Sequence, residues 1–331
     1  MPLALAAMLA VAAPASASEA PRRPARAAQH AASVDDELKR AVRYLEAGEP
    51  ARAAELLRRV LPRRDTAEVH SLLGNAEETS GNLVAAAEEF QKAAHMDPTE
   101  EHLFDWGNNL LHLRAFQPAT DVLTAAVERH PRSARLQVAL GIALYSRGRF
   151  EEAIRSFCAA ADLDPRDARP YLFLGEMYGV SAALSLEITR RLAFFVEAQP
   201  KNALAHFYYA MSLWKTEPGA APSREVEEHL HKAASLDPRL AKAPFQLGVL
   251  YSDQHRYAQA VVALEESVRL DPQMAQAHYR LAQAYRRSGR EDLAQRELDA
   301  FEKLQPAESP PATPRPATPP PAAPPPGRSV R

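Results

Sequence analysis

The sequence predicts an all-α protein that is built as a solenoid of antiparallel helix pairs. Two observations lead to this prediction. Glycine is scarce, at 12 of 331 residues, which favours helices over hairpins. Proline recurs at nearly even intervals of 33 to 38 residues, at Pro98, Pro131, Pro165, Pro200, Pro238, Pro272 and Pro306. Self-similarity at a fixed period of roughly 20–50 residues is the sequence signature of a stacked repeat architecture.

Each period divides into two amphipathic helices that are joined by a tight turn. In the first half, apolar and small residues stand at helical spacing, as at Leu140, Gly141 and Leu144. A small residue precedes most of the prolines by 24 positions, and a bulky apolar residue precedes them by eight, as Gly141 and Phe157 precede Pro165. We expect the small residue to let the two helices approach closely, and the proline to end the second helix. The turns are centred on Gly81, Gly148 and Gly289.

The segment Ala134–Pro165 resembles a tetratricopeptide repeat at nearly every characteristic position. The resemblance extends over residues 34–308 and gives about eight repeats, the first of which has Asp65 where the proline would fall. It implies a right-handed superhelical solenoid in which the first helix of each pair lines a concave groove. Two repeats depart from the pattern: the fifth, and the sixth, whose turn is lengthened up to Ser223, which is expected to cap the next helix.

The chain before the repeats has the pattern of an exported protein. Residues 1–18 contain an apolar run from Leu3 to Ala13, then Ala15 and Ala17 at the spacing of a cleavage site. This pattern predicts a signal peptide, and the run is too short to span a bilayer. No basic residue precedes the run, so two alternatives stay open. Either the true start lies upstream, or the segment is only an Ala-rich leader on a cytoplasmic protein. Residues 19–33 are predicted to be a polar linker.

Residues 309–331 form a proline-rich tail, which is predicted to be solvated and biased toward polyproline II. A spacer, a ligand for a proline-binding domain and an attachment to the cell wall all remain open for it.

The candidate ligand site is the stripe of the first helices that faces the groove. Asn75 and Asn108 occupy the same position in adjacent repeats, where the resemblance implies an amide that holds the backbone of an extended peptide. Many of the other groove positions are apolar, which indicates a hydrophobic peptide or an amphipathic helix as ligand. The alternative is that the irregular fifth and sixth repeats tilt, so that these residues pack internally. The further candidates are Phe104, Arg135, Tyr145, Phe207, Trp214, Phe245 and Tyr279.

The sequence gives no sign of catalytic, metal or cofactor chemistry. It has no glycine-rich phosphate loop, paired metal-ligand motif or nucleophile elbow. The single cysteine, Cys158, lies in an apolar run and is predicted to be buried, and His229 and His231 point to different faces of one helix. A net charge of -2 argues against a nucleic-acid binder. No enzyme activity, cofactor or membrane span is therefore expected.

These features together predict a non-catalytic scaffold for protein–protein interaction that is periplasmic or secreted. Its partner is expected to be a protein or peptide, and its role the assembly of a cell-envelope complex. Two alternatives stay open. One is a self-assembling structural protein that stacks through Leu298 and Phe301 near the end of the last repeat. The other is an accessory subunit of an envelope enzyme.

Overall fold

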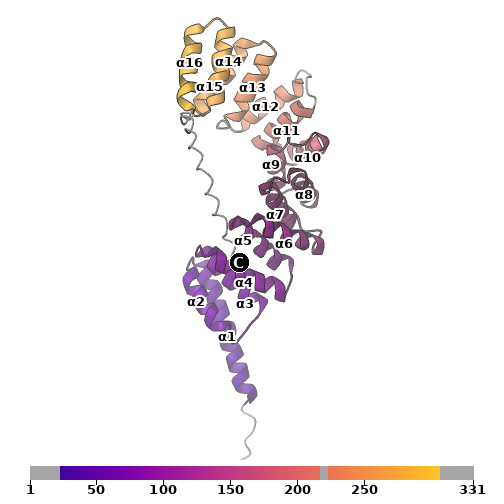
Figure 1. Ribbon diagram of the computed structural model, residues 1–331, viewed down its shortest axis with the longest axis vertical. Coiled ribbons are helices and arrows are strands. Elements are labelled where there is room, and N and C mark those ends of the chain that lie inside the picture. The colour runs from indigo at the N-terminus through magenta and orange to yellow at the C-terminus, as the bar shows by residue number, and fades with distance from the viewer. Residues whose placement is uncertain (1–22, 217–222, 306–331) are drawn as a thin grey trace, which may run out of the picture. The chain divides into compact units, whose positions relative to one another are not determined.

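The computed structural model describes residues 23–216 and 223–305, and every regular element in these ranges is helical (Figure 1). The helices follow one another as pairs, so that α1 and α2 form repeat 1 and α15 and α16 form repeat 8. The all-α fold of paired helices and the number of repeats are as the sequence predicts. The proline-rich tail and residues 1–22 lie outside the described residues.

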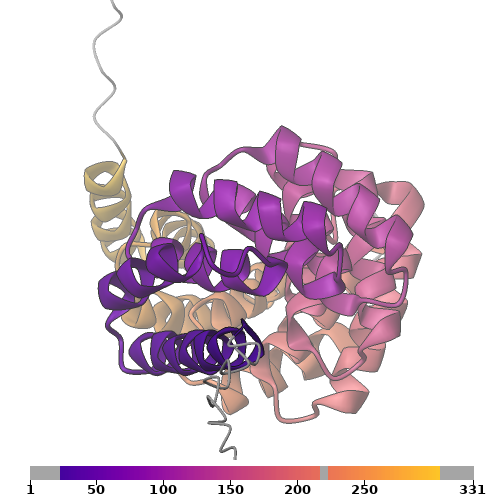
Figure 2. The same ribbon diagram turned by 90° about the horizontal axis from the view of Figure 1, so that it is seen from below.

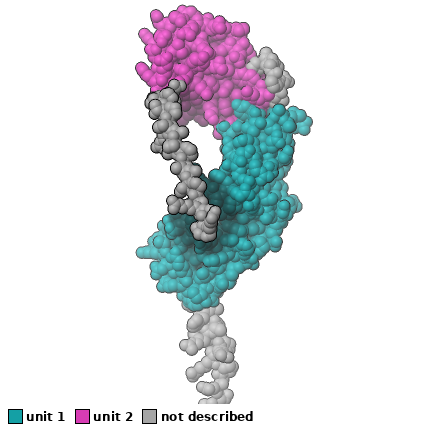
Figure 3. All heavy atoms as spheres, in the orientation of Figure 1, with its two compact units in different colours: residues 1–198 teal, residues 199–331 magenta. Residues whose placement is uncertain are grey.

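The described chain divides into two compact units, which Figure 3 shows in different colours, with the boundary between Ala198 and Gln199. Unit 1 holds repeats 1 to 5, and within it each second helix packs against the first helix of the next repeat. Its helices are α1 (Arg23–Glu46), α2 (Pro50–Val60), α3 (Ala67–Thr79), α4 (Leu83–Met96), α5 (Glu100–His112), α6 (Phe116–Arg129), α7 (Ala134–Ser146), α8 (Phe150–Leu163), α9 (Ala168–Glu176) and α10 (Ser185–Ala198).

Unit 2 holds repeats 6 to 8 and repeats the same packing of consecutive pairs (Figures 1 and 2). Its helices are α11 (Ala203–Thr216), α12 (Arg224–Leu236), α13 (Lys242–Asp253), α14 (Tyr257–Leu270), α15 (Ala275–Arg287) and α16 (Glu291–Leu304). Most of the lengthened turn between α11 and α12 lies outside the described residues. Ser223 stands at the N-cap position of α12, but its side chain makes no capping hydrogen bond, contrary to the sequence-based expectation.

The pairing of small and bulky residues inside each repeat fixes how closely the two helices approach. A Cβ added to Gly141 would lie 2.6 Å from Cε1 of Phe157, and one added to Gly74 would lie 2.7 Å from Cδ1 of Phe90. The same clash arises between Gly107 and Leu123 and between Gly248 and Leu264. Side chains in a protein core are close-packed. The facing ring or isobutyl group therefore occupies the space that a side chain on each of these four glycines would need.

The ends of the helices follow from local chemistry. Side-chain oxygens of Thr66, Thr99, Ser133 and Asp167 accept hydrogen bonds from backbone N–H groups in the first turns of α3, α5, α7 and α9. These bonds satisfy donors that a helix N-terminus otherwise leaves without partners. The second helices α4, α8, α12 and α14 end at an aspartate that directly precedes a periodic proline, as the spacing predicts.

Two parts of unit 1 differ from the sequence-based expectation. Helix α1 begins at Arg23, inside the segment predicted to be a linker, because its run of alanines has high helix propensity and Pro24 lies in its first turn. In repeat 5, α9 is only 9 residues long, and a short 3-10 turn at Ala182–Leu184 leads into α10. Ile188, which replaces the usual alanine of that repeat, is fully buried.

Candidate functional site

The candidate site in unit 1 is the surface that α3, α5 and α7 form together, since these first helices contact one another along the unit. We call it the first-helix surface. Asn75 on α3 and Asn108 on α5 both lie there, half-buried, one position after the small glycine of their repeats. Neither side-chain amide makes a hydrogen bond with another described residue. Both amides therefore keep their donors and acceptors available for a ligand.

The residue after Asn108 has the opposite character. Asn109 is fully buried, and its amide donates to Oε1 of Glu78 at 2.9 Å. The same carboxylate oxygen lies 3.0 Å from Nδ1 of His112. Glu78 on α3 thus holds two side chains of α5, which fixes the spacing between the two helices that present Asn75 and Asn108. The side-chain oxygen of Asn109 has no partner among the described residues.

Phe104 and Arg135 lie together across the contact between α5 and α7. The guanidinium of Arg135 stands 4.9 Å from the centre of the Phe104 ring, a cation–π contact. Its Nε donates to Oε1 of Glu100 at 2.7 Å, and the hydroxyl of Ser133 donates to the same oxygen at 2.7 Å. The hydrogen bonds from Ser133 and Arg135 lower the pKa of Glu100. Arg135 is thus held in place and its charge is largely balanced within unit 1.

Asp105 is a half-buried carboxylate of α5 that the sequence analysis did not single out. Burial is the main cause that raises its pKa to about 6, and the neighbouring charges of Glu101 and Glu78 add to the effect. Arg135 and His102 act in the opposite direction without cancelling it. A carboxylate without a close cationic partner is unfavourable in such a place, and a positively charged ligand group would relieve it.

The aromatic candidates differ in exposure. Tyr145 of α7 is 42% exposed and contacts Phe150 edge to face, with ring centres 5.5 Å apart. In unit 2, Trp214 and Phe245 are half-buried, and Tyr279 is 41% exposed beside Phe301.

Phe207 is only 5% exposed, so its side chain belongs to the core of unit 2 and is not open to a ligand there. For Phe207 the structure favours internal packing, the alternative that the sequence left open.

The described residues hold little that suggests reaction chemistry. No group of three or more His, Cys, Asp or Glu side chains in residues 23–216 and 223–305 is arranged to bind a metal ion. Cys158 is buried, as predicted, and this burial raises the pKa of its thiol to about 12, where a thiolate nucleophile does not form near neutral pH. None of the helices that could be searched has the length and apolar character needed to cross a bilayer.

Stacked helix pairs with an open first-helix surface define a repeat scaffold. Two sequence models described as tetratricopeptide repeat match the chain, one at residues 38–101 and 104–168 and the other at residues 251–311. The chain therefore belongs to the tetratricopeptide repeat family, whose members generally act as protein-interaction scaffolds.

Several solved structures are similar to this chain, and the first of the following three shows the same fold. The C-terminal part of a TPR repeat-containing protein from Cytophaga hutchinsonii is 14% identical, with a TM-score of 0.60, over 74% of this chain and 99% of that one. MamA from Desulfovibrio magneticus RS-1 is 23% identical, with a TM-score of 0.44, over 50% and 93%. YrrB, described as a TPR protein with an unusual peptide-binding site, is 22% identical, with a TM-score of 0.42, over 56% and 93%.

Proposed function

We propose that this protein is a non-catalytic scaffold that binds a peptide segment of a partner protein on the first-helix surface of unit 1. The observation that supports this proposal most directly is the pair of unengaged amides, Asn75 and Asn108. They stand at the same position of adjacent repeats, on helices whose spacing Glu78 fixes. A polar side chain that a rigid helix holds in place is well suited to a ligand because little freedom is lost when the ligand binds.

The geometry of the two amides suits an extended peptide. Packed helices lie roughly 8–10 Å apart, and an extended chain advances about 3.3 Å per residue. Amides on neighbouring first helices can therefore bond to backbone groups about three residues apart in one strand. Each amide offers a carbonyl oxygen to a backbone N–H and an NH₂ group to a backbone C=O. This recognition does not depend on the ligand's side chains.

Side-chain selectivity would come from the neighbouring residues of the same surface. Phe104 and Tyr145 present aromatic area, and such side chains contribute strongly to binding because they bury large apolar surfaces with few rotatable bonds. The half-buried Asp105 would favour a Lys or Arg side chain of the ligand. The proposed ligand is thus a peptide with apolar residues and at least one basic residue.

The test is capture of partners with the variant Asn75→Ala/Asn108→Ala. The protein is tagged at its C-terminus and recovered from its host after mild cross-linking, and the co-purified proteins are identified by mass spectrometry. Peptides from the candidates are then titrated against the purified protein. We expect the double variant to weaken peptide binding by about ten-fold or more, since each lost hydrogen bond contributes roughly 0.5–1.5 kcal/mol.

The matched control is Gln91→Ala/Gln117→Ala, which removes two exposed amides from α4 and α6, the second helices of the same two repeats. It should bind as the unmodified protein does. Equal binding by all three proteins would exclude the first-helix surface as the site. Circular dichroism of each variant shows whether the repeats remain folded.

We place the scaffold outside the cytoplasm, in the assembly of a cell-envelope complex, because of the signal-peptide pattern of residues 1–18. The mass of the protein recovered from its host tests this placement. A mature N-terminus close to residue 19 supports export, and an intact N-terminus in the cytoplasmic fraction contradicts it. An accessory subunit of an envelope enzyme would appear in the same experiment as that enzyme among the captured partners.

Self-association is the second candidate function, and helix α16 supplies the observation that favours it. Among its residues only Ala294 is buried, while Leu298 and Phe301 are partly exposed on the last repeat. Terminal repeats of a solenoid normally need a polar outer face for solubility. Light scattering over a range of concentrations would show a rising mass if two chains stack through this face, and a constant monomer mass excludes it.

A further inference from the structure

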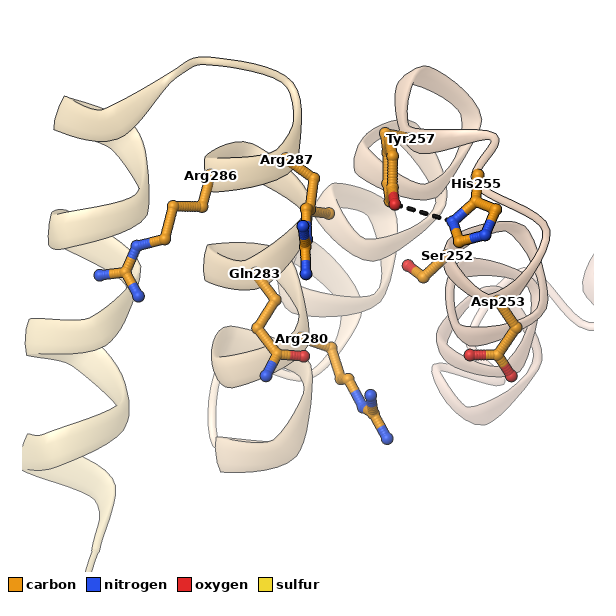
Figure 4. A pocket seen from close by; sticks show the side chains of 9 residues that line it. Ser252, Asp253, His255, Tyr257, Arg280, Gln283, Arg286 and Arg287 are labelled. Carbon is orange, nitrogen blue, oxygen red and sulfur yellow. Dashed lines mark hydrogen bonds between the residues drawn. The ribbon is translucent and has the colours of Figure 1, made fainter.

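Unit 2 contains a hollow of about 690 Å³ that the proposed function does not use. It lies between the C-terminal part of α13 with the turn that follows it and one face of α15 (Figure 4). Ser252, His255 and Tyr257 line it from the first side, and Arg280, Gln283 and Arg287 line it from the second.

The charge of the hollow is positive because of α15. This helix holds three arginines and no acidic residue in its 13 positions. Arg286 donates from Nε to Oε1 of Glu291 at 3.1 Å, and in Figure 4 its side chain is turned away from Tyr257 and His255. Arg280 and Arg287 are exposed and form no ion pair with any described carboxylate. The one acidic residue of the lining is Asp253, which is exposed.

The two unpaired arginines stand on one face of α15. They are seven residues apart, which is about two helical turns and roughly 10 Å along the axis. One carboxylate does not span this distance. In an extended peptide, side chains two positions apart lie about 7 Å apart on the same side, and side chains four positions apart lie about 13 Å apart. Two acidic side chains of such a peptide can therefore reach the two guanidinium groups.

Neutral donors complete the hollow. The amide of Gln283 lies between the two arginines along α15 (Figure 4). The hydroxyl oxygen of Tyr257 is 2.9 Å from Nδ1 of His255. When His255 donates its Nδ1–H to that oxygen, the Tyr257 hydroxyl keeps its own hydrogen for a ligand oxygen. Guanidinium groups and neutral donors around one hollow are the chemistry that binds carboxylates, and a charge-assisted hydrogen bond is stronger than a neutral one.

We propose that this hollow binds an acidic peptide segment through its side-chain carboxylates. The inference rests on the proposed function, since it extends peptide binding to a second surface with a different ligand chemistry. Nucleic acid is the less suitable occupant, because its binding draws on a long series of phosphate contacts, whereas two unpaired arginines face this hollow and the chain has a net charge of -2. Phe245 on α13 and Tyr279 on α15 offer apolar contacts on the same two helices.

The test is a direct titration of the full chain with a fluorescein-labelled peptide that holds glutamates at alternate positions and has an amidated C-terminus. We expect it to bind, and to bind about ten-fold more weakly to Arg280→Gln/Arg287→Gln, which removes two charge-assisted contacts. The control Arg239→Gln/Arg296→Gln makes the same change of charge at exposed positions outside the hollow, and should keep the affinity of the unmodified protein.

Three further probes separate the ligand classes. The same peptide with glutamine in place of glutamate should not bind. The second probe is a glutamine peptide with a free C-terminus. If it binds and the acidic peptide does not, the assignment to side-chain carboxylates is wrong. The third probe is a single-stranded oligonucleotide, and if it is the only ligand that loses affinity in the Arg280→Gln/Arg287→Gln variant, the assignment to a peptide is wrong. Equal affinity of both double arginine variants for the acidic peptide would exclude the hollow as its binding site. If this happens while Asn75→Ala/Asn108→Ala still loses its partners, the proposed function stands and only this inference fails.

Discussion

In repeat 6, Nδ1 of His206 lies 2.8 Å from Nδ1 of His229, so that two imidazole rings share one hydrogen bond between α11 and α12. The other ring nitrogen of His206 is 3.0 Å from the carbonyl oxygen of Pro200 and must donate to it. Nδ1 of neutral His206 is then an acceptor, and His229 donates the shared hydrogen. The pair links the two helices of the repeat to the proline that closes the preceding one.

Two other repeats use the same position differently. His70 and His278 also lie four residues before the small residue of their repeats, and both are buried. Their Nδ1 atoms face carboxylates, at 2.5 Å for Glu89 and 2.6 Å for Glu297. Both ring nitrogens of His70 and of His278 lie within hydrogen-bond distance of an oxygen atom. In repeat 6 a second imidazole replaces the carboxylate.

The histidine pair predicts that repeat 6 is sensitive to acid. Burial, followed by the charge of His206, lowers the pKa of His229, although Glu225 and Glu228 act against this. The native state therefore binds fewer protons than the unfolded chain, whose histidine titrates near pH 6.5. The stability that neutral His229 contributes to repeat 6 is fully present above pH 6.5 and is lost as the pH falls below that value. Amide hydrogen exchange in α11 and α12 should become faster at pH 5.5 than intrinsic exchange rates account for.

His229→Glu gives repeat 6 the histidine–carboxylate pair of repeats 2 and 8. We expect this variant to protect α11 and α12 better at pH 5.5 than the unmodified protein, by about 1 kcal/mol in the free energy of local opening. Exchange in α3 and α4 of repeat 2 serves as the internal reference. The same pH dependence in both proteins would show that His229 does not control it.

The close contact between Gly141 and Phe157 gives a second prediction. Gly141→Ala places a methyl group 2.6 Å from the Phe157 ring, which is itself stacked on Phe173 with ring centres 4.6 Å apart. The ring cannot move freely, so the helix pair must open, and we expect a loss of about 1–3 kcal/mol in the free energy of unfolding. Urea unfolding measures it. The control is Gly179→Ala, where a Cβ meets nothing within 4 Å. It should change the free energy of unfolding by less than Gly141→Ala does.

The fold could be predicted because residues that pack against each other recur at a fixed spacing in the sequence. The fixed spacing of Gly141 and Phe157 recurs at Gly74 and Phe90, and a contact that must form in every repeat leaves a periodic trace. The site could be predicted only in part. Asn75 and Asn108 occupy the same position of adjacent repeats, and this recurrence is the sequence signal that identified them as candidates.

Residues that occur once in the array were harder to predict. Asp105 gained its importance mainly from burial, which no local pattern shows, and then from the charges of Glu101 on the same helix and Glu78 on another. Arg280 and Arg287 became a candidate site only when α13 and its turn were placed beside them. Phe207 stands at a groove position by its spacing, yet it is buried in unit 2, because repeat 6 departs from the regular period.

Asp105 provides the third prediction. Its ordinary pKa of 3.8 is raised to about 6, so the unfolded chain ionises it at a lower pH than the native protein does. The native state loses stability as the pH rises from about 4 to 6 and does not regain it above. We expect Asp105→Asn to raise the free energy of unfolding at pH 7 by about 1–2 kcal/mol, less than the full shift implies because water still reaches the side chain.

At pH 4 the difference in stability between the two proteins should be much smaller, since Asp105 is then neutral in the native state and only partly ionised in the unfolded chain. The control Glu128→Gln changes an exposed carboxylate of α6 that does not contribute to the shift of Asp105, and it should have little effect at either pH. A loss of stability in Asp105→Asn at pH 7 would mean that the carboxylate is held by a favourable interaction. In that case Asp105 would not favour a basic ligand side chain.

The turn of repeat 3 gives the last prediction, because Arg114 adopts a φ of 55° where repeats 1, 2, 4 and 8 have glycine. A left-handed conformation costs a residue with a Cβ roughly 1–2 kcal/mol, and glycine avoids this at the expense of about 0.5–1 kcal/mol of extra entropy in the unfolded chain. Arg114→Gly should therefore raise the free energy of unfolding by about 0.5–1 kcal/mol in urea. The reciprocal change, Gly148→Arg at a φ of 72°, should lower it by a similar amount, since a Cβ there meets no atom within 4 Å and only the backbone responds. If Arg114→Gly lowers stability instead, the arginine side chain contributes more to the turn than its backbone strain removes.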